Sequence, residues 1–122
     1  MIIEKQKYMK PWGNYELIDD KICATKLLFI GKGKRTSLQI HKKRTEMLRL
    51  VHGAIKVQLE NKDIIIDDSV DGGWIYIERG VMHRITALED SKMIEVMFGE
   101  YEESDIVRID DDYGRLENTG ST

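Results

Sequence analysis

The stretch that decides the fold runs from Gly33 to Gly53 and reads GKRTSLQIHKKRTEMLRLVHG. Apolar and polar residues alternate on either side of its basic segment, Lys42–Thr45. Alternation with a period of two is typical of β-strands that bury one face. The stretch therefore predicts two strands, Thr36–Ile40 and Met47–Val51, joined by a tight connection at Lys42–Thr45.

The same pattern recurs along the rest of the chain. It predicts further strands at Asn14–Ile18, Ile22–Ile30, Ala54–Leu59, Lys62–Asp67, Trp74–Ile77, Met82–Ala87 and Lys92–Phe98. These segments are rich in β-branched and aromatic residues, and Gly, Asn and Asp separate them. Met1–Lys10 is a candidate edge strand, and only Glu102–Ile106 is suited to a helical turn. Many short strands at near-regular spacing predict an all-β fold, either a β-sandwich or a small barrel.

Length and composition indicate one globular domain. The chain has 122 residues, of which 41% are hydrophobic and 34% are charged, a balance that excludes a disordered chain. We expect residues 1–122 to form a single domain with a core at about 9–115 and a frayed tail at 117–122. No apolar run approaches the roughly 18 residues that cross a bilayer. With a single cysteine, Cys23, and no recognisable secretory leader, we expect a cytoplasmic protein without a membrane partner.

The net charge of −3 conceals an asymmetry. Residues 1–60 contain 13 Lys and Arg against 6 Asp and Glu, whereas residues 61–122 contain 6 against 16. The chain has no helix-turn-helix pattern, zinc-finger spacing or aromatic RNA-binding motif, so we expect no nucleic-acid partner. A positively charged pocket for a small anion and a solvated basic face both fit this distribution.

The polar residues Gln39, His41 and Glu46 stand at the middle of the opening stretch. Residues two apart on a strand share a face, so Gln39 and His41 point into one space, and the tight connection brings Glu46 back toward them. His83 follows a turn at Arg79-Gly80 and can complete the set. An amide oxygen, two imidazoles and a carboxylate suit a divalent ion such as zinc, manganese, cobalt or iron(II).

Spacing alone leaves a second interpretation open. Gln39 and His41 can be a hydrogen-bonded pair in a polar barrel mouth, with His83 an independent surface residue.

Two groups of residues resemble the cupin motifs. The spacing of Gly33, Gln39, His41, Glu46 and Gly53 is similar to the first motif, with Gln39 where the first histidine usually stands. The spacing of Gly72, Gly80 and His83 is similar to the second. The resemblance implies a single-domain cupin, a small double-stranded β-helix or jelly-roll barrel, with Gln39, His41, Glu46 and His83 as the metal ligands.

Further motifs narrow the resemblance. They are Lys10-Pro11-Trp12-Gly13, Arg44-Thr45-Glu46, Gly80-Val81-Met82-His83-Arg84, Ile94-Glu95-Val96 and the closing Asp105-Ile106-Val107-Arg108, Asp111 and Tyr113-Gly114-Arg115. In this order they resemble a type II phosphomannose isomerase domain, which also forms the C-terminal part of bifunctional isomerase/mannose-1-phosphate guanylyltransferases. The chain departs from the family at Lys42-Lys43, Met47-Leu48 and Met97, which alters the expected pocket wall.

The resemblance implies a metal-dependent isomerase that interconverts mannose 6-phosphate and fructose 6-phosphate through an enediol. Arg108 and Arg115 are expected to bind the phosphate, and Arg44 to point into the cavity or to solvent. Glu95 interrupts the apolar strand MIEVMF, so it is the first candidate for the general base or for a residue that orients a ligand. Lys34 is the second candidate base.

Two other kinds of function remain open. A cupin that binds a sugar phosphate or a nucleotide sugar without turnover uses the same scaffold, so the fold does not decide between binding and catalysis. A metal-dependent oxygenase is disfavoured because Gln39 replaces an imidazole. We also expect a homodimer, since small cupins present apolar sheet edges that a second copy can cover.

Overall fold

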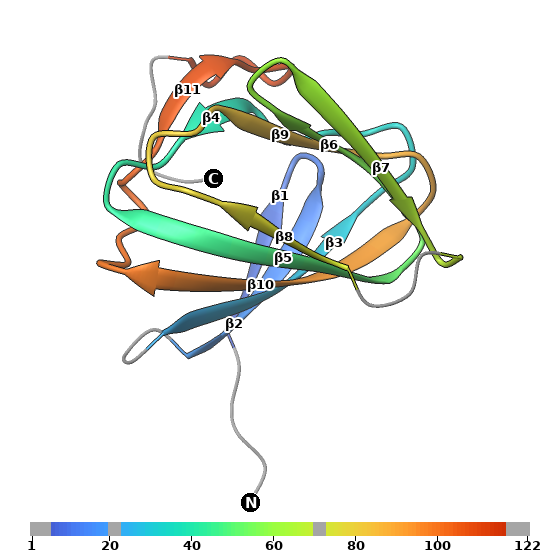
Figure 1. Cartoon of the computed structure of the whole chain (residues 1–122), viewed down its shortest axis with the longest axis horizontal. Coiled ribbons are helices and arrows are strands. Elements are labelled where there is room, and N and C mark those ends of the chain that lie inside the picture. The colour runs from blue at the N-terminus through green and yellow to red at the C-terminus, as the bar shows by residue number, and fades with distance from the viewer. Residues whose placement is uncertain (1–5, 20–22, 70–72, 117–122) are drawn as a thin grey trace, which may run out of the picture.

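The computed structural model of the chain describes residues 6–19, 23–69 and 73–116, and these form eleven β-strands (Figure 1). In chain order the strands are β1 (Gln6–Lys10), β2 (Gly13–Asp19), β3 (Ala24–Ile30), β4 (Leu38–Ile40), β5 (Arg44–His52), β6 (Ala54–Leu59), β7 (Lys62–Asp67), β8 (Trp74–Ile77), β9 (His83–Ala87), β10 (Ser91–Gly99) and β11 (Val107–Asp110). The tail predicted to fray, 117–122, lies outside the described residues.

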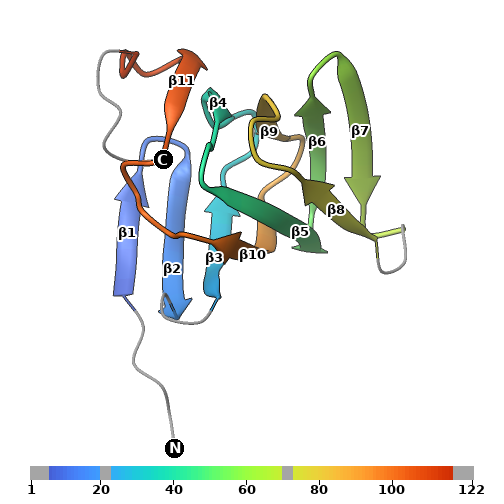
Figure 2. The same ribbon diagram turned by 60° about the vertical axis from the view of Figure 1, so that its left-hand side comes forward.

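The strands form two antiparallel sheets that pack face to face. The larger sheet has the order β1-β2-β3-β10-β5-β8, and the smaller has the order β11-β4-β9-β6-β7. Figure 2 shows the smaller sheet as a row running from β11 to β7 above the larger one. This is the predicted all-β fold.

Alternation places one face of each strand in the interior. The inner faces supply the apolar core, formed by Trp12, Tyr15, Leu28, Ile30, Leu48, Ile55, Val57, Ile66, Ile75, Ile77, Ile85, Ala87 and Met93. Burying these side chains is the main favourable term in folding.

Toward one end of the barrel the inward residues are polar. In the larger sheet Lys26 is directly opposite Glu95, and in the smaller sheet Gln39 is directly opposite both Arg108 and His83. Since buried polar groups are costly without partners, a cluster of them at one end indicates a functional site.

The structure differs from the sequence predictions in two segments near this polar end. Strand β5 begins at Arg44 rather than at Met47, so Arg44 is on a strand and shares a face with Glu46. The predicted helical turn at Glu102–Ile106 is a single hydrogen-bonded turn, with the backbone nitrogen of Asp105 3.0 Å from the carbonyl oxygen of Glu102. Strand β11, which was not predicted, follows it.

The edge strand β8 carries apolar side chains that reach solvent. Trp74 and Tyr76 are 44% and 54% exposed. An exposed apolar edge is the feature on which the homodimer prediction depends, and the homodimer stays a prediction. Among the described residues, no helix has the length and apolar character to cross a membrane.

Candidate metal centre

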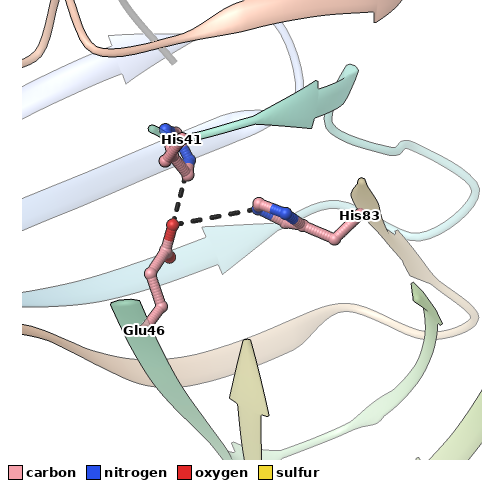
Figure 3. Close-up of side chains that lie close together, drawn as sticks. All are labelled: His41, Glu46 and His83. Carbon is pink, nitrogen blue, oxygen red and sulfur yellow. Dashed lines mark ion pairs between the residues drawn. The ribbon is translucent and has the colours of Figure 1, made fainter. Parts of the chain in front are cut away.

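Three potential metal ligands converge at the polar end of the barrel. His41 follows β4, Glu46 lies on β5 and His83 begins β9, and Figure 3 shows their side chains pointing toward one another. One ligand atom from each lies within 4.8 Å of the other two. All three residues are buried, with 2–3% of their surface exposed. Two imidazoles and a carboxylate in a buried site suit the divalent ions predicted from the sequence, namely zinc, manganese, cobalt or iron(II).

Contacts with backbone carbonyl groups orient both histidine rings so that Nε2 of each points toward this centre. Nδ1 of His41 lies 2.6 Å from the carbonyl oxygen of Asp105, and Nδ1 of His83 lies 2.9 Å from that of Val81. A carbonyl oxygen only accepts, so Nδ1 donates in both cases and Nε2 is left for the centre. The Nε2 atoms of His41 and His83 lie 2.9 and 3.8 Å from Oε1 of Glu46 (Figure 3). Metal-binding histidines commonly use such a bond to fix the ring.

The electrostatics of the centre favour a bound cation. Burial alone would raise the pKa of Glu46, but the neighbouring His41, Arg44 and His83 hold that pKa well below its usual range. Burial lowers the pKa of His83 despite the attraction of Glu46, which favours the neutral imidazole that binds metals. Nε2 of His41 and Oε1 of Glu46 are both electron-rich, so at 2.9 Å they need a proton or a cation between them.

The fourth predicted ligand, Gln39, turns its amide nitrogen toward the centre. Nε2 of Gln39 lies 3.1 Å from Nε2 of His41, and Oε1 of Gln39 accepts a hydrogen bond of 2.7 Å from Ser37. Gln39 and His41 are thus a hydrogen-bonded pair, as the second interpretation of the sequence expected, but His83 is buried beside them. A half-turn of the amide would present its oxygen instead, because the Ser37 hydroxyl can also accept. A ligand role for Gln39 requires that opposite orientation.

Glu95 lies against Glu46 on the inner face of β10. Burial first, and then the charge of Glu46 and a hydrogen bond to it, raise the pKa of Glu95 well above its usual range. The raised pKa favours the protonated form of Glu95, which can donate to Glu46. This contact favours the orienting role for Glu95, since a base at this position would first have to lose that proton.

Arg44 extends into the centre itself. Its Nη2 lies 3.3 Å from Nε2 of His41, and its Nε lies 3.6 Å from Oε1 of Glu46. The residue is 1% exposed, so of the two directions left open by the sequence the side chain takes the inward one.

The connection from β10 to β11, residues 100–106, holds the centre in place. The carboxylate of Asp105 accepts hydrogen bonds from the backbone nitrogens of Lys42 and Lys43 at 2.9 and 2.8 Å, while its carbonyl oxygen accepts the bond from His41. No local pattern predicts this role of Asp105, because the contact joins residues 64 positions apart.

A second buried ionic cluster adjoins the centre. The Lys26 ammonium group donates to Glu103, and so does the Tyr101 hydroxyl. Nζ of Lys26 also lies 4.1 Å from the centre of the Tyr15 ring. Sequence analysis missed Lys26, although this residue interrupts the apolar strand ATKLLFI in the same way that Glu95 interrupts MIEVMF.

Glu103 makes the stability of the fold depend on pH. Burial opposes its ionisation, but the charge of Lys26 and the hydrogen bonds from Lys26 and Tyr101 lower its pKa to about 2. Since an unfolded glutamate has a pKa of about 4.3, ionised Glu103 stabilises the folded state above that pH, and the contribution is lost as pH falls toward 2.

We therefore expect the difference in Tm between wild type and Glu103→Gln to shrink as the pH is lowered from about 6 to about 3. Thermal unfolding followed by circular dichroism at several pH values measures this difference. Glu102→Gln is the control, because Glu102 is exposed and pairs with Lys43. A Tm difference that stays constant with pH would contradict the low pKa of Glu103 in the folded state.

The predicted phosphate-binding arginines lie in different surroundings. Arg108 is buried opposite Gln39, whereas Arg115 donates to both carboxylate oxygens of Asp111, at 2.9 and 3.1 Å. Burial lowers the pKa of Lys10 and of Arg108. The positive charges of Lys26, Arg115 and Arg108 lower the pKa of Lys10 further. The charge of Arg115 does the same to the pKa of Arg108. Lys10, Lys26, Arg108 and Arg115 therefore form a cationic group beside the centre, within which Glu103 pairs with Lys26 and Asp111 pairs with Arg115.

Lys34 lies far from the centre. Its carbonyl oxygen accepts a hydrogen bond from the backbone nitrogen of Ala87, which ends β9, whereas His83 begins that strand. Four residues of strand span about 13 Å. The Lys34 side chain is exposed, and its Nζ lies 3.4 Å from the carbonyl oxygen of Pro11. The structure thus corrects the prediction that Lys34 serves as a base.

A family model described as "Mannose-6-phosphate isomerase C-terminal" matches residues 2–111. The chain belongs to this family. The matched range contains His41, Glu46 and His83, so the candidate metal centre is part of the mannose-6-phosphate isomerase C-terminal domain.

Known relatives of this domain carry it within longer chains. The xanthan biosynthesis protein XanB of Xanthomonas campestris pv. campestris is 33% identical over 114 residues, which cover 90% of this chain and 24% of XanB. The mannose-1-phosphate guanylyltransferase ManC of Salmonella typhimurium is 32% identical over 114 residues, covering 88% of this chain and 22% of ManC. The chain therefore spans less than a quarter of the length of these relatives.

Solved structures agree on the fold. The capsular polysaccharide assembling protein CapF of Staphylococcus aureus superposes with a TM-score of 0.72 at 13% identity, over 88% of this chain and 34% of CapF. KdgF of Halomonas superposes with a TM-score of 0.68 at 17% identity, over 81% of this chain and 89% of KdgF. The mannose-6-phosphate isomerase C-terminal domain of this chain therefore has the all-β cupin fold of these neighbours.

Proposed function

We propose that this domain is a metal-dependent aldose–ketose isomerase that interconverts mannose 6-phosphate and fructose 6-phosphate. The observation that supports this most directly is the convergence of His41, Glu46 and His83, whose ligand atoms lie within 4.8 Å of one another. The family supplies the substrate class, since its description names mannose 6-phosphate.

The reaction moves a proton between C1 and C2 and places negative charge on the sugar oxygens. A divalent ion held by His41, Glu46 and His83 would supply Lewis-acid stabilisation of that charge. Glu95 would keep Glu46 oriented through their hydrogen bond. The buried guanidinium of Arg44 would add a second positive charge beside the reacting oxygens.

The cationic group formed by Lys10, Lys26, Arg108 and Arg115 would bind the phosphate. Arg108 is directly opposite Gln39, so a phosphate held there lies close to a sugar at the centre. A bound anion would relieve the electrostatic repulsion among these positive charges. Lys10 and Lys26 are additions to the arginines that the sequence suggested.

A coupled assay with mannose 6-phosphate tests this proposal. We expect saturable turnover that a chelator abolishes and a divalent ion restores, and a loss of roughly 100-fold or more in kcat for His83→Ala. His52→Ala is the matched control, because His52 is exposed and pairs with Asp68 at 3.0 Å. Tight binding of mannose 6-phosphate without turnover would refute the isomerase and support a sugar-phosphate binding domain.

A further inference from the structure

The guanidinium of Arg44 contacts the same atoms that would bind a metal ion. Its Nη2 approaches Nε2 of His41 to 3.3 Å, and its Nε approaches Oε1 of Glu46 to 3.6 Å. Nε2 of a neutral imidazole has a single lone pair, and the amide nitrogen of Gln39 approaches it as well, at 3.1 Å. A metal ion bound to this atom would therefore displace every N–H group that points at it, including that of Arg44. Arg44 and a metal ion would therefore compete for the same two ligand atoms.

Arg44 is also incompletely satisfied where it lies. Its Nε and Nη1 are buried and have no hydrogen-bond partner among the residues that the structure describes. Its Cζ lies 5.2 Å from the centre of the Tyr101 ring, which offers a cation–π contact but no acceptor oxygen in the plane of the guanidinium. Charged donors without acceptors are costly to bury.

The negative charge of Glu46 explains why the guanidinium stays there. A buried carboxylate needs a compensating positive charge nearby. The guanidinium of Arg44 provides such a charge, with its Nε 3.6 Å from Oε1 of Glu46.

We propose that Arg44 supplies the positive charge of the absent metal ion in the metal-free protein, and that a divalent ion competes with it for His41 and Glu46. Once the ion is bound, the guanidinium loses both contacts, and its N–H groups become available to an anionic oxygen of the ligand. Metal binding therefore precedes and favours anion binding. This inference rests on the proposed function in one respect, namely that the centre binds a metal.

Removing Arg44 has opposite expected effects if it competes with the metal ion and if it only supports the metal ligands. If the guanidinium must be displaced, a neutral side chain of similar length strengthens metal binding, because one repelling charge and two competing contacts disappear. If Arg44 only supports His41 and Glu46, its removal loosens the ligands and weakens metal binding.

Calorimetric titration of the metal-free chain with zinc or manganese chloride distinguishes these roles. We expect Arg44→Met to bind either ion roughly tenfold or more tightly than wild type, and Arg44→Lys, which keeps the charge, to stay close to wild type. Arg44→Gln is a second neutral variant in case the methionine variant does not fold. Arg49→Met is the matched control on the same strand, since the Arg49 guanidinium lies 5.9 Å from the Trp74 ring.

Each outcome decides a different part of the account. Tighter metal binding by Arg44→Met or Arg44→Gln supports competition between Arg44 and the metal ion. This holds even if wild type binds no ion. In that case only the proposal of a metal-dependent isomerase fails. Equal or weaker binding by variants that are folded by circular dichroism overturns the competition and leaves the isomerase standing. If neither wild type nor variants bind an ion, both fall.

Discussion

Replacing Glu46 by glutamine is expected to weaken the binding of zinc or manganese by roughly 100-fold or more and to abolish turnover of mannose 6-phosphate. Glutamine keeps the size of the side chain but removes the only negative charge among the three converging ligands. The pKa of Glu46 lies well below its usual range, so the carboxylate is ionised at neutral pH. Titration calorimetry with the metal, together with the coupled assay, measures both effects.

Folding has to be separated from binding in this experiment. Glu46→Gln leaves the buried Arg44 without its counter-charge, and an uncompensated buried charge costs about 3–5 kcal/mol. The Tm of the variant is therefore measured first, and binding is compared only for folded protein. His52→Ala, which removes an exposed histidine, is expected to bind metal as wild type does. A folded Glu46→Gln protein with undiminished metal affinity would show that the ion binds elsewhere.

Replacing Gly13 by alanine is expected to destabilise the fold by about 3 kcal/mol or more. A Cβ at Gly13 would lie 1.7 Å from the carbonyl oxygen of Phe29, on the paired strand β3, and the residue has a φ of +153°. Neither atom can move away without breaking the pairing of β2 with β3, because the clash is with backbone.

Gly33→Ala provides the comparison for Gly13→Ala. Gly33 also has a positive φ, +80°, but no atom lies within 4 Å of the position of its Cβ. We expect this variant to lose only about 1–2 kcal/mol, from the backbone conformation alone. Chemical denaturation of the two variants measures the difference, and equal losses would show that the close approach of β2 and β3 is not what requires glycine at position 13.

The alternation of apolar and polar residues predicted most strands, and it failed where the pattern is inverted. In β11 the apolar Val107 and Ile109 are exposed while Arg108 is buried. Such a strand cannot be recognised from hydrophobicity, because its inner face serves the polar end of the barrel instead of the apolar core.

The ligands of the candidate centre could be predicted because a period-two pattern and the family motifs both point to them. The position of Arg44 could have been predicted as well, since residues two apart on a strand share a face. The sequence leaves its direction open because Lys42–Thr45 is predicted as a tight connection, whereas β5 already begins at Arg44. The role of Asp105 depends on a backbone contact across 64 residues, which no local pattern encodes.

We expect His41, Glu46 and His83 to bind one divalent ion. Diffraction from crystals grown with zinc, measured above and below the zinc absorption edge, locates such an ion directly. One anomalous peak is expected about 2.0–2.2 Å from Nε2 of His41, Nε2 of His83 and a carboxylate oxygen of Glu46, with Arg44 withdrawn from His41 and Glu46. Crystals soaked in saturating zinc that show no peak there, with the Arg44 guanidinium still against His41 and Glu46, would contradict it.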